Sequence, residues 1–97
     1  MRFEWDEQKR QSNIQKHGLD FADAPTIFSG FMLADQDQRE EYGEERFIGT
    51  GMLNTIIVVV VYTEPDENTI RIISLRKATR DERRQHEQAI RDRLGTP

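Results

Sequence analysis

The sequence predicts a small α+β domain of two layers, in which helices cover a meander of four antiparallel strands. Residues 56–61 are six consecutive apolar residues, a pattern typical of a strand buried on both faces. The connections between the strand-like segments around this run are short, and short connections make neighbouring strands antiparallel. Segments with helical features stand before and after the strands, so the helices that precede the sheet would cover one of its faces.

The N-terminal segment predicts a short strand followed by a polar helix. Aromatic and charged residues alternate over residues 2–5, as in a half-buried strand. Asp6 is a suitable N-cap for a helix over residues 7–17, and Gly18 is well placed to end it. Because Ile14 is its one clear apolar side chain, we expect this helix to dock on the surface through a narrow seam.

A second helix is predicted to end near Phe28. Its apolar face consists of Phe21, Ala24, Ile27 and Phe28. Pro25 leaves two possible starts, because a proline is tolerated in the first turn of a helix but not deeper. Asp23 as the cap puts Pro25 in that first turn, whereas Asp20 puts it further inside. We expect a loose first turn from Asp20.

Four strand segments follow. Residues 31–38 predict an edge strand, residues 44–53 a second strand, the run from residue 56 the central strand, and residues 70–77 the last one, after a turn at residues 65–68. In the second strand one face would hold Phe47, Gly49, Gly51 and Leu53, and the other Arg46, Ile48, Thr50 and Met52.

The chain closes with a charged helix predicted over residues 80–94. Thr79 and Glu82 have the spacing of a capping box at its start. Its apolar seam is thin and consists of His86, Ala89, Ile90 and Leu94. So narrow a stripe predicts weak docking, or a surface that a partner completes.

The composition limits the class of protein. Its 97 residues are enough for one domain, residues 1–97, with a modest core. There is no cysteine, which excludes disulfides, thiolate zinc sites and cysteine nucleophiles. No apolar run approaches the length that crosses a membrane, and no signal-peptide pattern is present. We therefore expect a cytoplasmic protein without a membrane partner.

The net charge of −4 hides a division along the chain. Residues 1–67 hold 6 Lys and Arg against 14 Asp and Glu, whereas residues 68–97 hold 8 against 4. An acidic average argues against a nucleic-acid binder, but the basic end leaves room for a local phosphate site. The acidic part could offer docking sites to basic elements of a partner.

Several separate motifs, in the same order, resemble the BrnT family of bacterial type II toxins, relatives of the RelE-like ribonucleases. They are Phe3-Glu4-Trp5-Asp6-Glu7 with Lys9, Asn13 and Lys16-His17-Gly18; Asp20-Phe21 with Ala24; Tyr42-Gly43-Glu44 with Arg46; Val61-Tyr62-Thr63-Glu64; and Arg71-Ile72-Ile73-Ser74 with Arg76-Lys77-Ala78-Thr79. The resemblance implies a RelE-like fold and RNA cleavage that halts growth. It also implies a BrnA-like antitoxin whose DNA-binding domain represses the operon, in a hetero-oligomer expected to be a heterotetramer that meets DNA only through the antitoxin.

RNA cleavage without a metal needs cations at the phosphate and carriers for two protons. The candidate catalytic residues are Arg46, Arg76, Lys77, His17, His86 and Glu64, and the candidate RNA-binding residues are Arg71, Arg80 and Lys16. Arg46 resembles the mid-strand arginine of RelE-like toxins. Arg76 and Lys77 end a strand beside a helix N-terminus, where a phosphate can bind.

Several of the candidates also have a structural interpretation. Arg46 could pair with Glu44 or Glu45 on the surface. His17 could stabilise a helix C-terminus, His86 could belong to the core, and Glu64 could be a solvated loop residue. Arg71 and Arg76 are five positions apart, so strand alternation predicts that they lie on opposite faces.

No cofactor is expected, because two histidines without an acidic motif make a poor metal site and no Gly-rich phosphate loop is present. Two other functions remain compatible with the sequence. One is a non-catalytic module that binds RNA or a partner and acts as a co-repressor subunit. The other is a structural subunit that recruits a DNA-binding antitoxin to an operator.

Overall fold

The computed structural model describes residues 1–95. Its elements are β1 (Arg2–Trp5), α1 (Glu7–His17), the 3₁₀ turn η1 (Phe21–Asp23), α2 (Ala24–Phe28), β2 (Leu33–Gln36), β3 (Phe47–Leu53), β4 (Ile56–Asp66), β5 (Thr69–Lys77) and α3 (Arg80–Arg93). The α+β class is confirmed. In this part of the chain no helix has the length and apolar character that crossing a membrane requires.

The five strands form one mixed sheet in the order β1-β5-β4-β3-β2. Strands β2 to β5 pair antiparallel with their sequence neighbours, whereas β1 pairs parallel with β5. The sequence predicted the strand β1 but not its position in the sheet, so the predicted four-stranded sheet lacked this fifth strand. The four residues of β1 do not by themselves indicate a partner strand more than sixty residues away, because that pairing depends on how the intervening chain folds.

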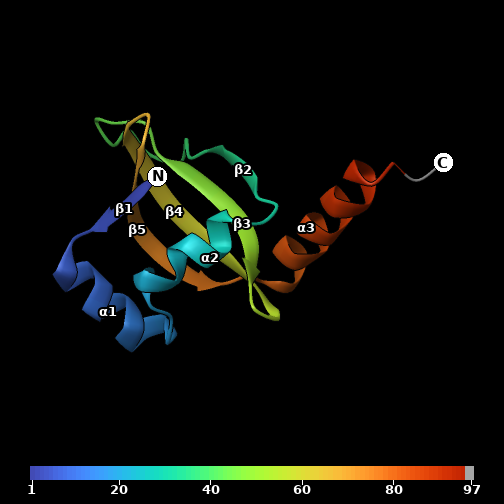
Figure 1. The fold of residues 1–97 in the computed structure, drawn as a ribbon, viewed down its shortest axis with the longest axis horizontal. Helices are drawn as coiled ribbons and strands as arrows, with labels where there is room; N and C mark the ends of the chain where they lie inside the picture. Colours follow the sequence, from blue (N-terminus) through green and yellow to red (C-terminus); the bar gives the residue numbers. More distant parts are fainter. Residues whose placement is uncertain (96–97) are drawn as a thin grey trace.

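The hydrophobic core lies on one face of the sheet, beneath η1 and α2 (Figure 1). Phe21 and Ile27 are fully buried there. In the middle strand, Val58 and Val60 turn to this core, while Val59 turns to the opposite face and is also buried, with 1% exposed. The prediction that residues 56–61 form the centre of the sheet is confirmed, since β4 is the third of five strands.

Glycine in β3 lets α2 and the following loop approach the sheet. A Cβ at Gly51 would lie 2.6 Å from the sulfur of Met32 and 2.9 Å from Ile27 Cγ2, and one at Gly49 would lie 2.8 Å from Met32 Cε. Any larger residue would push these apolar groups away. The predicted face with Phe47, Gly49, Gly51 and Leu53 is therefore the one that meets the core.

Both possible starts of the second helix occur. The side chain of Asp20 accepts a hydrogen bond from the Ala22 N–H and caps η1. The α-helix then begins after Asp23, with Pro25 in its first turn. A tight 3₁₀ turn before the α-helix keeps Pro25 out of a position where its missing N–H would cost a hydrogen bond.

Helix α1 covers the edge of β5 where β1 ends. The buried Asn13 donates to the Leu75 carbonyl at 2.8 Å and accepts from the Leu75 N–H at 3.0 Å. It also donates to the Leu19 carbonyl at 3.0 Å. One amide side chain thus replaces the backbone of a further strand, so α1 is fixed against β5 although it presents little apolar surface.

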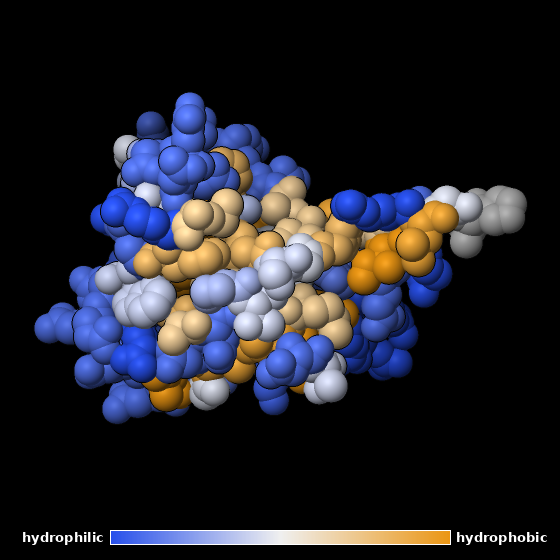
Figure 2. All heavy atoms as spheres, in the orientation of Figure 1, coloured by the Kyte–Doolittle hydropathy of each residue, from blue (hydrophilic) through white to orange (hydrophobic). Residues whose placement is uncertain are grey.

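Helix α3 begins on the opposite face of the sheet and then projects away from the body (Figure 1). His86 is fully buried, and its Nδ1 lies 2.9 Å from the hydroxyl of Thr50, a residue of the β3 face that turns away from the core. Further along, Leu94 is 77% exposed. Figure 2 shows an apolar band across the middle of the molecule and apolar atoms on the projecting helix. The seam predicted for this helix therefore docks through His86, with Ala89 and Ile90 half-buried, and does not extend to Leu94.

Replacing Asn13 by alanine should lower the free energy of unfolding by about 2 kcal/mol, since buried backbone groups of Leu75 would lose their partner. Denaturant titration followed by circular dichroism measures the change. The control is Gln15→Ala on the exposed side of α1, which should change stability by less than about 0.5 kcal/mol. Equal stability of both variants would show that Asn13 does not hold the strand edge.

Candidate functional site

Two connected hollows open between α1 and the sheet. We call the first the α1 groove; it has a volume of about 510 Å³ and lies between Lys9, Ser12, Lys16 and His17 on the helix and Ile73 and Ser74 on β5. We call the second the arginine pocket; it has a volume of about 360 Å³ and is lined by Glu4, Asp6, Lys9, Glu44, Arg46 and Arg71, among others. Asp6, Lys9 and Ile73 belong to both, so the hollows form one continuous surface.

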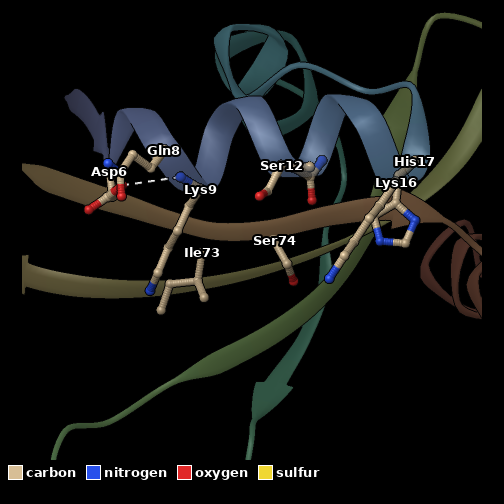
Figure 3. Close-up of a pocket in the computed structure, with 9 residues that line it drawn as sticks. Asp6, Gln8, Lys9, Ser12, Lys16, His17, Ile73 and Ser74 are labelled. Carbon is tan, nitrogen blue, oxygen red and sulfur yellow. Dashed lines mark hydrogen bonds between the residues drawn. The ribbon is translucent and has the colours of Figure 1, made fainter.

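The helix side of this surface is basic. Figure 3 shows Lys9, Lys16 and His17 pointing from α1 toward Ile73 and Ser74 of β5. None of these three side chains forms an ion pair with a residue of the described chain. Lys9 and Lys16 are seven residues apart, which is two helical turns, or roughly 10 Å along one side of α1.

Arg71 reaches the arginine pocket because β5 contains an extra residue. The register between β4 and β5 shifts by one residue at Ile73, and such a bulge reverses the alternation of side chains. Arg71 pairs with Thr63 and Arg76 with Val59; these β4 residues are four apart and share a face. The prediction that Arg71 and Arg76 lie on opposite faces is therefore wrong.

The same register places Arg46 beside Arg71. Phe47 pairs with Tyr62, so Arg46, one residue earlier, lies opposite Thr63, whose other neighbour is Arg71. The two arginines are thus separated by two strand spacings, about 10 Å between backbones, and their long side chains line one pocket. The Thr63 hydroxyl between them is buried and has no hydrogen-bond partner among the described residues.

Arg46 is held from two sides and keeps two donor groups free. Its Nε donates to Glu44 Oε2 at 3.3 Å, and its guanidinium carbon lies 4.1 Å from the centre of the Tyr42 ring. Within residues 1–95 neither Nη group has a hydrogen-bond partner. Arg71, in contrast, directs Nε and Nη2 to Glu4. Arg46 therefore has its two Nη groups available as donors, and their geometry suits two phosphate oxygens.

The structure does not bring Arg46 to the other predicted cations. Arg76 lies about 13 Å further along the strands and directs its two Nη groups to Glu82 at 2.8 and 2.9 Å. Lys77 lines a different hollow beside α3, and Arg80 is exposed at the start of that helix. These three residues hold or flank the junction of β5 with α3.

The predicted proton carriers are dispersed. His17 ends α1 and lines the α1 groove (Figure 3). Glu64 follows Thr63 in β4, and strand alternation turns it away from Arg46 and Arg71. His86 is enclosed between β3 and α3, where burial lowers its pKa, so its core interpretation fits the structure better than a catalytic one.

The predicted set lacked Lys9 and Tyr42, as well as the carboxylates of Glu4 and Glu44 that pair with the two arginines. Lys9 lies where both hollows meet, and its seven-residue spacing from Lys16 was the available signal. Tyr42 supports the guanidinium of Arg46; no periodicity marks it, because it lies in a loop, and its place in the motif Tyr42-Gly43-Glu44 with Arg46 was the available signal. In the described part of the chain, no three His, Asp or Glu side chains gather in a way that could hold a metal ion.

Comparison with known proteins agrees with this architecture. A family model described as the ribonuclease toxin BrnT of a type II toxin-antitoxin system matches residues 5–82. The chain belongs to the BrnT family. The crystal structure of the Brucella abortus ribonuclease toxin BrnT is 35% identical, with a TM-score of 0.62 over 82% of this chain and 99% of that one. No curated protein sequence matches.

The region shared with the BrnT family includes most of the site. The match ends at Glu82, in the first turn of α3. Lys9, Lys16, His17, Arg46 and Arg71 fall inside it, whereas most of the projecting helix falls outside. The family relationship recognised from separate motifs is confirmed, and it covers the elements that build both hollows.

The pair of Arg76 and Glu82 should make stability depend on acid. Hydrogen bonding to Arg76 lowers the pKa of Glu82 to about 2. Its ionised form therefore stabilises the fold above the ordinary glutamate pKa, and this contribution is lost as the pH falls from about 5 toward 2. Glu82→Gln should cost about 1 kcal/mol at pH 7 and progressively less below pH 5. Urea titration across this range measures the difference; identical acid profiles for wild type, Glu82→Gln and Arg76→Ala would contradict it.

Proposed function

We propose that this chain is a metal-independent endoribonuclease with a RelE-like fold, the toxin of a type II toxin-antitoxin pair, and that the scissile phosphate binds in the arginine pocket. One observation carries the proposal. Arg46 is fixed by Glu44 and Tyr42 and leaves its two Nη groups unpaired within the described chain, beside Arg71 and Lys9 in one hollow. A guanidinium that is already positioned, with further cations beside it, can stabilise a phosphate that gains negative charge during the reaction.

The cleavage needs little chemistry from the protein. The ribose 2′-OH attacks the adjacent phosphorus and its proton passes to a base. The bond from phosphorus to the 5′-oxygen then breaks, which leaves a 2′,3′-cyclic phosphate, and the 5′-oxygen takes a proton from solvent water. Arg46, Arg71 and Lys9 would stabilise the doubly charged phosphorane, and the carboxylates of Glu4 and Glu44 stand beside the two guanidinium groups, where either can accept the 2′-OH proton.

The α1 groove would guide the rest of the RNA strand. Lys16 and His17 lie on the same side of α1 as Lys9 (Figure 3), so Lys16 continues the positive charge of the arginine pocket along the helix, with the His17 ring beside it. This track concentrates positive charge where the phosphates pass, although the whole chain carries a net charge of −4. His17 and Lys16 then bind the backbone near the cleaved bond.

Arg46→Ala should reduce RNA cleavage by 10² to 10³-fold, because the main donors to the transition-state charge would be lost. The assay is purified protein with a single-stranded RNA in EDTA, followed by separation of the products. Arg84→Ala is the matched control, since it removes the same charge from an exposed position on α3 and should keep full activity.

The same assay, together with growth after induction, distinguishes the ribonuclease from the two rival functions. RNA binding without scission by the wild type would favour the non-catalytic module. Normal growth after induction of the chain alone would favour the structural subunit. If growth stops, mapping the new RNA ends identifies the cleaved sequence.

We propose a BrnA-like antitoxin with a DNA-binding domain as the partner, in a heterotetramer in the cytoplasm. The loop between β2 and β3 offers it a charged surface, with Glu40, Glu41 and Glu45 all exposed. Changing these three residues to glutamine should slow association with the antitoxin and weaken the complex about tenfold. Titration calorimetry at two salt concentrations measures this, and an unchanged affinity would exclude the loop as the docking surface. Glu44 is left intact because it holds Arg46.

A further inference from the structure

The loop of residues 37–46 is organised around one buried carboxylate. The side chain of Asp37 is 1% exposed, yet its pKa is lowered to about 2, chiefly by hydrogen bonds from Arg39. Arg39 contacts it through Nε at 2.8 Å and Nη2 at 2.7 Å, and the Tyr42 hydroxyl donates to Asp37 Oδ2 at 3.2 Å. An ionised carboxylate shielded from water requires such partners, so the contacts with Arg39 and Tyr42 fix the shape of the loop.

The two ends of this loop are tied together. The Asp37 N–H donates to the Arg46 carbonyl at 2.7 Å, one step beyond the last β2–β3 pair, Gln36 with Phe47. Between these ends Gly43 has φ +74°, a conformation that favours glycine. The chain can therefore fold back after Tyr42 and bring its ring beside the end of β3.

The Tyr42 ring meets the residue that the proposed chemistry needs most. The ring centre lies 4.1 Å from the guanidinium carbon of Arg46, a distance at which the aromatic face attracts the cation. The ring is held by Asp37 through its hydroxyl, while Glu44 holds Nε of Arg46. Asp37, Tyr42 and Arg46 thus form a chain of contacts from a buried charge to the arginine pocket.

We propose that Tyr42, anchored by Asp37, is a positioning residue that fixes the direction of the Arg46 guanidinium in the arginine pocket. It does not touch the RNA; it acts by restricting an arginine side chain that would otherwise sample many rotamers. A donor fixed before the reaction stabilises the transition state without first being ordered. The catalytic part of this inference rests on the proposed ribonuclease function, but the positioning itself does not.

The kinetic test compares two variants of Tyr42. Tyr42→Leu removes the ring and should lower kcat about tenfold, with KM changed less than threefold. Tyr42→Phe keeps the ring and loses only the hydroxyl, so we expect a loss of about threefold. Equal damage from both variants would show that the ring does not carry the effect. Gln38→Ala, an exposed change in the same loop, should keep wild-type kinetics.

A double-mutant cycle separates positioning from a general structural role. In the Arg46→Ala background, Tyr42→Leu should have no further effect on kcat, because its target is gone. If Tyr42→Leu costs the same factor with and without Arg46, the two residues act independently and the proposal is overturned.

A measurement without RNA keeps the inference testable even if the chain proves inactive. Nitrogen-15 relaxation of the Arg46 Nε–Hε group should show a restricted side chain in the wild type and a mobile one in Tyr42→Leu. An unchanged order parameter would refute the positioning role. A changed one together with no RNA cleavage by the wild type would refute the proposed function and leave the positioning intact.

Discussion

The β-bulge at Ile73 is the local constraint on which the candidate site depends. Without this extra residue in β5, Arg71 would point into the core side of the sheet, and Arg46 would face the pocket without a second guanidinium. The bulge residue also lines both hollows. A single irregularity in one strand therefore decides which charges meet, as bulges near functional sites commonly do by redirecting a side chain.

The two ends of β5 have different tasks. Toward its start, Arg71 and Glu4 join β5 to β1 beside the arginine pocket. Toward its end, Arg76 binds Glu82, whose side chain also accepts from the Thr79 N–H in the capping box of α3. At the basic end of this strand, where the sequence predicts a phosphate site, Arg76 holds a helix whose only buried residue is His86. A charge pair suits this junction because α3 has little apolar surface with which to dock.

Much of the fold followed from local patterns. The caps at Asp6 and Thr79, the buried run of β4 and the alternation in β3 are short-range signals, and each appears in the structure as expected. Parts that involve distant partners did not follow. The parallel pairing of β1 with β5 and the Asn13 bonds to Leu75 join residues more than sixty positions apart, where periodicity contains no information.

The sequence by itself determined the family, the α+β class and the order of the elements, because motif order, hydrophobic periodicity and capping are properties of neighbouring residues. Only the tertiary structure decided the neighbours of the candidate residues. It grouped Arg46 with Arg71 and Lys9, gave Arg76 to Glu82 and enclosed His86. The type of a residue determines which chemistry its side chain can perform. Strand register and one bulge determine on which face of the sheet each charged side chain lies and which residues are its neighbours, and register depends on the whole sheet.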